Sequence, residues 1–215
     1  MLLIGLASVV ALLTPPGPDS SGASAAAYYL QRVVAKTPAT LARVSEKDMA
    51  GTWSHGGPFG GSHLYLFEDH TYIYTEWADI LRETIYDRGT WRARSGMLAL
   101  APGPSVTWTP ASDRRYLIVQ PPGGRVLLLG VDFGLAPFVC LSAKEPSKAP
   151  TWLEVAAHGP RKPWRKGEAA RVRARLAKES WRPCFFAKEG CPRPDVGCDP
   201  RAAEQENGAD GRRHD

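Results

Sequence analysis

The sequence predicts a mainly β protein in which about 8–10 short antiparallel strands form a barrel, with helices before and after it. The tripeptide Gly-Thr-Trp occurs twice, at 51–53 and at 89–91, and each copy opens a stretch in which polar and apolar residues alternate. Short runs of β-forming residues are separated by hairpin-sized turns such as Pro-Pro-Gly-Gly at 121–124. Turns this short join antiparallel neighbours, because a parallel crossover needs about a dozen residues or more.

Residues 50–158 are expected to form the barrel domain, because their alternation has the period of two that is typical of strands. This period places Leu64 and Tyr65 on opposite faces of one strand. The Gly-rich segment 56–61 precedes a strand and not a helix, so we expect a flexible loop there and no phosphate site. The strands are predicted near 51–54, 62–68, 71–78, 83–93, 96–100, 105–109, 115–120, 125–131, 137–142 and 151–155.

The N-terminal segment, residues 1–27, has the character of a signal peptide. Residues 1–13 are apolar apart from Gly and Ser, and this run is too short to span a bilayer comfortably. Small residues follow, and 23–25 or 25–27 would suit a signal peptidase. No Lys or Arg precedes the apolar run, so an uncleaved signal anchor and a buried N-terminal helix stay open as alternatives. We expect a periplasmic or secreted protein, tethered to the membrane if this segment is not cleaved.

Residues 28–49 are expected to form a helical lead into the barrel. Tyr29, Val33 and Leu41 belong to an apolar stripe with helical spacing. Thr37 precedes Pro38, and a residue before proline is disfavoured in the α conformation. We therefore predict two short helices in this stretch.

Residues 159–198 combine a basic helix with a Cys-rich segment. The formal net charge of the 215-residue chain is +5, and the basic excess is concentrated after Pro160. The helix is expected over 167–181, with Val172 and Leu176 on its apolar side. Its opposite face forms a candidate patch for an anionic envelope component, made of Arg171, Arg175, Lys178 and Arg182. Export argues against nucleic acid as the partner.

Four cysteines are expected to staple the C-terminal part of the chain: Cys140, Cys184, Cys191 and Cys198. An oxidising compartment would let them pair, and the sequence alone does not choose among the three possible connectivities. A zinc site is the alternative. However, six residues separate each of the last three cysteines from the next, whereas paired zinc ligands are usually closer in sequence. Residues 199–215 are polar and lack apolar periodicity, so a disordered tail is predicted.

Aromatic residues fall on both faces of the predicted strands, which leaves two interpretations of them. They can fill the core and form cross-strand pairs, which is the interpretation we favour. Alternatively, some of them line a pocket for an apolar or aromatic ligand, with polar anchors among them. The candidate ligand-binding residues are Tyr65, Tyr74, Trp77 and Arg92.

The polar residues offer weaker candidates for chemistry. His63 begins a strand and His70 lies in the turn at its far end, roughly 20 Å away, so a shared metal is not expected. The nucleophile pattern Gly-x-Ser-x-Gly is absent from the sequence. Carboxylates near one predicted loop could serve a hydrolase if two of them met in a cleft. These carboxylates are Glu76, Asp79, Glu83 and Asp87.

The Gly-x-Trp on the first strand, followed by an up-and-down meander, is similar to the lipocalin and calycin group. The segment 63–100 adds to this resemblance, since a tight turn joins two strands and a second Gly-Thr-Trp opens a later one. The resemblance covers residues 50–155 and includes small exported bacterial domains of lipocalin-like shape. It implies an antiparallel barrel. Either Arg115 or Arg125 could be the arginine that closes the barrel base, and the Thr-Asp-Tyr turn of that group is not found.

These patterns together predict a non-enzymatic exported binding or interaction module of the cell envelope. A carrier of a small apolar ligand inside the barrel is the first alternative, and a hydrolase that uses the loop carboxylates is the second. No cofactor and no metal are expected.

Overall fold

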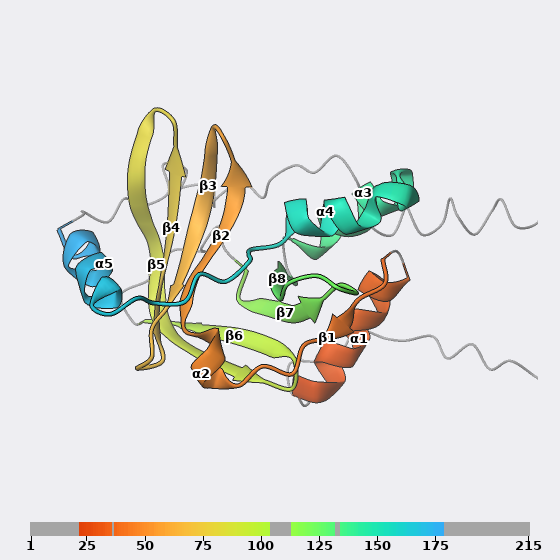
Figure 1. Cartoon of the computed structure of the whole chain (residues 1–215), viewed down its shortest axis with the longest axis horizontal. Helices are drawn as coiled ribbons and strands as arrows, with labels where there is room; N and C mark the ends of the chain where they lie inside the picture. The colour runs from red at the N-terminus through yellow and green to blue at the C-terminus, as the bar shows by residue number, and fades with distance from the viewer. Residues whose placement is uncertain (1–21, 36, 104–112, 132–133, 179–215) are drawn as a thin grey trace, which may run out of the picture.

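The computed structural model describes residues 22–35, 37–103, 113–131 and 134–178. It is mainly β, as predicted, with one antiparallel sheet that curls like half a barrel and carries helices at both ends (Figure 1). The sheet order is β1-β7-β6-β5-β4-β3-β2, and β8 pairs with β7. The strands are β1 (Thr40–Leu41), β2 (Gly51–Gly57), β3 (Gly60–Leu66), β4 (Thr71–Ala78), β5 (Leu81–Arg94), β6 (Met97–Pro102), β7 (Arg115–Gln120) and β8 (Leu127–Gly130).

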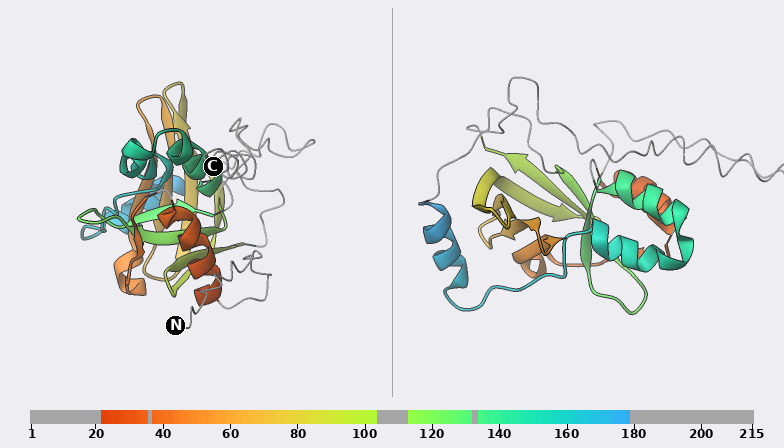
Figure 2. Two further views of the ribbon diagram at one scale, coloured as in Figure 1. Left: turned by 90° about the vertical axis from the view of Figure 1, so that its right-hand side faces the viewer. Right: turned by 90° about the horizontal axis from the view of Figure 1, so that it is seen from above.

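Most of the helices form two groups at opposite ends of the molecule, and the short α2 (Glu46–Met49) lies between them (Figure 2). At one end, α1, α3 and α4 bury their apolar residues against β7 and β8, around Phe138 and Leu153. At the other end, α5 packs on β3, β4 and β5. None of the helices in the described residues combines the length and the apolar composition that a membrane span requires. The helices are α1 (Gly22–Val34), α2 (Glu46–Met49), α3 (Leu135–Lys144), the 3-10 helix η1 (Pro146–Lys148), α4 (Ala149–Ala156) and α5 (Glu168–Leu176).

Four local predictions are wrong. The strands predicted at 137–142 and 151–155 are the helices α3 and α4. Their short apolar runs fit either period, and the spacing of the buried Leu135, Phe138 and Val139 is that of a helix face on the sheet. The second helix of the lead is mostly extended, since β1 precedes the four-residue α2. The Gly-rich loop at 56–61 is instead the paired tip of the β2–β3 hairpin.

Other predictions concern residues that lie partly or wholly outside the described ranges. The helix α1 begins at Gly22 and includes the candidate cleavage positions, so its start lies inside the predicted signal segment. The strand predicted at 105–109, the tail and three of the four cysteines lie outside the described residues. Cys140 is buried on α3. Export, the disulfides and the boundaries of the segments therefore stay predictions.

The two Gly-Thr-Trp tripeptides have the same structural role, with a glycine at a close backbone approach and a tryptophan in the core. Trp53 and Trp91 belong to the same core inside the curled sheet, and each is only 1% exposed. Each glycine stands where another backbone approaches: a Cβ on Gly51 would lie 2.6 Å from the Lys162 carbonyl oxygen, and one on Gly89 would lie 2.0 Å from the Ala101 carbonyl oxygen. A larger residue would therefore force these chains apart.

Residues 158–162 form a bridging segment between the two ends of the sheet. His158 exchanges backbone hydrogen bonds of 2.8 and 2.9 Å with Leu128 of β8. Lys162 exchanges two backbone hydrogen bonds of 2.9 Å with Thr52 of β2. The segment thus occupies polar backbone groups on β8 and β2, which strand edges otherwise expose. It also leads the chain from α4 to the outer face, where α5 packs.

A β-bulge in β5 decides which of its residues face inward. The register shifts between Tyr74 and Thr75 of β4, so that Tyr86 is an extra residue on β5. Ile85 consequently packs outward with α5, whereas the Asp87 carboxylate faces inward, where it accepts hydrogen bonds from interior side chains. Strict alternation would place both residues on one face, because they are two positions apart.

Candidate functional site

The outer face of β3, β4 and β5 carries the most distinctive surface of the described residues. Leu176 of α5 is fully buried there against Tyr65, Phe67 and Ile85. Trp164, which precedes the helix, donates a hydrogen bond of 2.9 Å from its indole nitrogen to the Leu66 carbonyl oxygen. The indole ring stacks on Phe67 with centroids 5.4 Å apart and planes 7° apart. The chain before α5 is therefore held by an aromatic contact as well as by backbone pairing.

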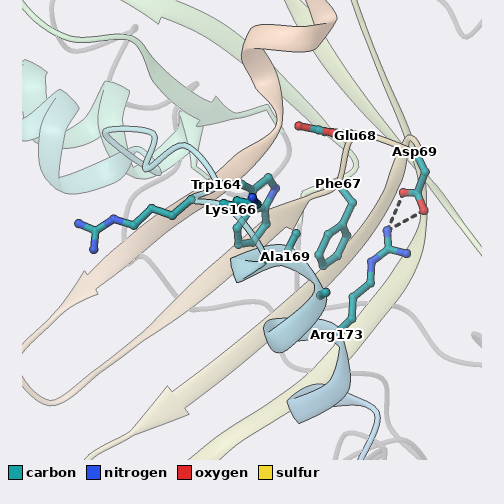
Figure 3. Close-up of a pocket in the computed structure, with 10 residues that line it drawn as sticks. Phe67, Glu68, Asp69, Trp164, Lys166, Ala169 and Arg173 are labelled. Carbon is teal, nitrogen blue, oxygen red and sulfur yellow. Dashed lines mark hydrogen bonds and ion pairs between the residues drawn. The ribbon is translucent and has the colours of Figure 1, made fainter.

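A groove of about 480 Å³ opens beside this aromatic stack (Figure 3). Phe67 and Trp164 form its apolar wall, and the Arg173 guanidinium carbon lies 4.0 Å from the centroid of the Phe67 ring. Arg173 also donates hydrogen bonds of 2.6 and 2.7 Å to the two carboxylate oxygens of Asp69. Burial disfavours the charged carboxylate and is the largest single influence, but the hydrogen bonds from Arg173 and Thr71 together lower the pKa of Asp69 to about 2.

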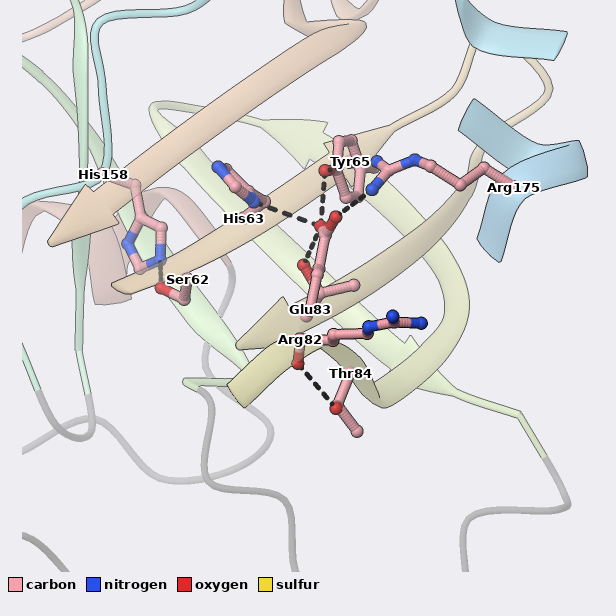
Figure 4. A network of polar contacts seen from close by, with 9 residues as sticks. Ser62, His63, Tyr65, Arg82, Glu83, Thr84, His158 and Arg175 are labelled. Atoms are coloured by element: carbon pink, nitrogen blue, oxygen red, sulfur yellow. Dashed lines mark hydrogen bonds and ion pairs between the residues drawn. The ribbon is translucent and has the colours of Figure 1, made fainter. Parts of the chain in front are cut away.

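A second ion pair, centred on Glu83, fastens α5 further along the same face (Figure 4). The carboxylate accepts hydrogen bonds of 2.6 Å from both Tyr65 and Thr75, and it pairs with Arg175. His63 Nδ1 lies 3.1 Å from Glu83 Oε1 and must donate, because an ionised carboxylate only accepts. Burial opposes ionisation, yet these four donors hold the pKa of Glu83 well below its usual range.

The basic residues around α5 therefore fall into two groups. Arg173 and Arg175 point to the sheet and are engaged by Asp69 and Glu83. A second group is exposed, and no acidic side chain in the described ranges forms an ion pair with any of its members. These exposed cations include Lys166, Arg171 and Lys178.

The inner face of the same strands holds a separate, buried polar cluster. Ser62 Oγ lies 3.0 Å from His158 Nε2, on the side of β3 away from Glu83 (Figure 4). Burial, followed by the nearby His55 and His63, lowers the pKa of His158 to about 3, so its imidazole is neutral at ordinary pH. The Tyr74 hydroxyl donates to Glu76 at 3.2 Å, and burial raises the pKa of that carboxyl.

An internal ion pair lies in this interior as well. Asp87 is fully buried and pairs with Arg114. The Tyr72 hydroxyl donates a hydrogen bond of 2.7 Å to the same carboxylate, and Arg114 donates to that hydroxyl at 3.1 Å. Burial and the adjacent Asp87 raise the pKa of Tyr72 well above its usual value. The three side chains thus satisfy one another's hydrogen-bonding groups, and a buried charge needs such partners to offset its loss of hydration.

The four predicted ligand-binding residues do not line one pocket. Tyr74 is buried inside the sheet, whereas Tyr65 lies under α5. Trp77 is half-buried and stacks at 6.4 Å on His63, which is bonded to Glu83. Arg92 is exposed on β5 beside a different groove. Their roles as ligand contacts stay predictions, but these positions separate them from a common site.

The other predicted sites are placed as follows. Asp79 is exposed, Glu83 is engaged on the outer face, and Glu76 and Asp87 point inward, so the four carboxylates do not lie together in one cleft. Of the predicted anionic-partner patch, Arg171 and Lys178 are exposed, Arg175 is engaged by Glu83, and Arg182 lies outside the described residues. The described residues contain no group of three or more His, Cys, Asp or Glu side chains placed to hold a metal ion.

The groove itself was missed by sequence reasoning, although one signal was present. Trp164 stands between Pro163 and Arg165, directly before the basic helix, where an isolated aromatic residue has no apolar neighbours in sequence. Such a residue usually has a packing or binding role. Its contact with Phe67, 97 positions earlier, could not be read from periodicity. Comparisons with protein-family models, with curated proteins and with solved structures find no match for this chain.

Proposed function

We propose that this protein is an exported, non-enzymatic binding module that holds an acidic polymer of the cell envelope against α5 and the adjoining groove. The observation that carries the proposal is the division of the cations around α5. Arg173 and Arg175 are engaged by the sheet, which leaves the exposed cations Lys166, Arg171 and Lys178 with no acidic partner among the described residues. Clustered cations raise the local concentration of anionic ligands and speed their association.

The groove adds a reason to favour a polysaccharide that carries acidic groups. Its apolar wall is formed by Trp164 and Phe67, and its rim carries Lys166 and Arg173. A sugar ring has an apolar face that can lie on an aromatic side chain, while its carboxylate or phosphate can meet a cation. A few polar groups around an aromatic wall are typical of ligand sites.

The alternative of an apolar carrier has less support. Trp53, Trp91 and Tyr72 are each about 1% exposed in the core inside the curled sheet, so large side chains occupy the space that a carrier needs for its ligand. A barrel of the lipocalin type remains part of the proposal for the fold. The bridging segment supports it, because it hydrogen-bonds to both β8 and β2.

The proposal is tested by measuring the affinity of the full chain for an alginate oligomer, a polyuronate, with neutral dextran as the control ligand. The charge-reversal variant Lys166→Glu, Arg171→Glu and Lys178→Glu should bind alginate about 100-fold more weakly, at about 1 kcal/mol for each cation near an anionic surface. Binding should also weaken as salt is raised.

A matched variant distinguishes this site from a general effect of net charge. Arg43, Lys47 and Lys144 are also exposed but lie on other parts of the molecule. Reversing these three charges should leave the alginate affinity within about threefold of the wild type, since charges far from the site are screened. Equal losses in the two variants, or equal affinity for dextran and alginate, would contradict the proposed site.

A further inference from the structure

Two hairpin tips project beyond the rest of the sheet, side by side (Figure 1). They are the β2–β3 turn, which carries Phe59, and the β4–β5 turn, which carries Ile80. Phe59 is 75% exposed and Ile80 is 85% exposed. The other exposed large apolar side chains in the described ranges, Val34 at 41% and Val155 at 53%, lie on helices.

The two tips form one unit, because β3 pairs with β4 up to Gly60 and Ala78. The Asp79 amide also donates a hydrogen bond of 3.0 Å to the Phe59 carbonyl oxygen. The Asp79 carboxylate lies against its own turn, since it accepts a hydrogen bond of 2.9 Å from the Ile80 amide. Phe59 and Ile80 are thus presented together on paired backbone.

The charged side chains near the tips do not create a strong positive or negative potential around Phe59 and Ile80. Asp79 and Arg82 are both exposed and have opposite charges. Glu83 is engaged by Arg175, and burial raises the pKa of Glu76, which disfavours its charged form. An attraction of these tips to a partner therefore has to come mainly from apolar contact.

We propose that this pair of hairpin tips inserts shallowly into the interface of a lipid bilayer. The two side chains offer roughly 300 Å² of apolar surface together. That area is below the roughly 500 Å² per partner that a stable protein interface needs, but it suits reversible insertion of a few side chains into lipid. Paired backbone groups at the tips also lower the cost of leaving water. This inference does not depend on the polymer site at α5, which lies on a different surface.

The test uses hydrogen exchange of the full chain with and without vesicles of zwitterionic phosphatidylcholine. Vesicles should slow exchange in the tip segments 56–61 and 78–82 by about tenfold or more, whereas α5 should not change. The variant Phe59→Ser with Ile80→Ser should lose this protection. The variant Val34→Ser with Val155→Ser, which removes the other exposed apolar side chains, should keep it.

Several results would overturn the proposal. One is the absence of vesicle-induced protection at the tips, and another is equal protection in the tip variant, since binding would then use another part of the chain. Protection that requires anionic phosphatidylglycerol and disappears in high salt would instead indicate an electrostatic attachment. Protection that grows with protein concentration in the absence of vesicles would identify a second copy of the chain as the occupant.

Discussion

The inner and outer faces of β3, β4 and β5 are built from alternate residues of the same strands, yet they differ in how they use charge and burial. On the inner face, Trp91 is closed off from water, and the Asp87 carboxylate is fully buried beside Arg114. On the outer face, the Asp69–Arg173 pair has side chains that are 51% and 41% exposed. We infer from this comparison that the inner face contributes more to stability than the outer face, where an ion pair that holds α5 is more exposed to water.

The largest loss of stability is expected when a large side chain is removed from the core on the inner face. Trp91→Ala removes a fully buried ring and a hydrogen bond of 3.0 Å from its indole nitrogen to the Phe67 carbonyl oxygen. The free energy of unfolding should fall by about 3–5 kcal/mol, as measured by urea denaturation. Trp77→Ala is the matched control, because Trp77 is only half-buried and belongs to none of the three core clusters. Trp77→Ala should lower the free energy of unfolding by less than half as much. Equal losses in the two variants would contradict the inference that the inner face contributes more to stability.

A smaller and local loss of stability is expected when the buried side chain that packs α5 on the sheet is shortened. Leu176→Ala truncates a fully buried side chain that packs on Tyr65, Phe67 and Ile85. It should weaken the docking of α5 by about 2–3 kcal/mol, seen as faster hydrogen exchange over 168–176. The unfolding midpoint of the sheet should change little.

Ala174→Ser is the control for that change, since Ala174 is exposed on the same helix. Exchange in α5 should then stay close to that of the wild type. If Leu176→Ala instead lowered the stability of the whole sheet as strongly as Trp91→Ala does, the outer face would be part of one cooperative core.

The smallest effect concerns the exposed ion pair and pH. The pKa of Asp69 is about 2 in the folded protein, against roughly 3.9 when unfolded. A lowered pKa means that the pair contributes above about pH 4, and that the contribution is lost as the pH falls toward 2. Because both side chains are about half exposed, we expect less than about 1 kcal/mol.

The measurement compares the free energy of unfolding of the wild type and of Asp69→Asn at pH 7 and at pH 2. The difference between the two proteins should be present at pH 7 and should shrink at pH 2. Asp79→Asn, at an exposed position where no ion pair is described, should show no such pH dependence. A difference for Asp69→Asn that is as large at pH 2 as at pH 7 would mean that ionisation is not its cause.

The strands could be predicted from sequence because a half-buried strand repeats every two residues. The stretch around Leu64 and Tyr65 follows this period, and the two residues fall on opposite faces as expected. The helices α3 and α4 were missed because each is a short apolar run, and a short run matches both the helix and the strand period. Contact with the sheet, around Phe138, favours the helix.

The candidate site was predictable only in its charge. The basic character of α5 follows from Arg171 and Lys178, and both are exposed as expected. The engagement of Arg175 by Glu83 was not predictable, because these residues are 92 positions apart and lie on different elements. For the same reason, the isolated Trp164 could signal a contact but not its partner, because Phe67 lies on a distant strand.

The sequence by itself determined the mainly β class and the paired use of Gly-Thr-Trp, where glycine allows close approach and tryptophan fills the core. These features are local, since they depend on period-two alternation and on the size of single side chains. Only the tertiary structure decided which face each residue of β5 occupies and which cations stay exposed. A bulge reverses the face of every residue beyond it, and an ion pair requires a partner that the chain brings near only when it folds.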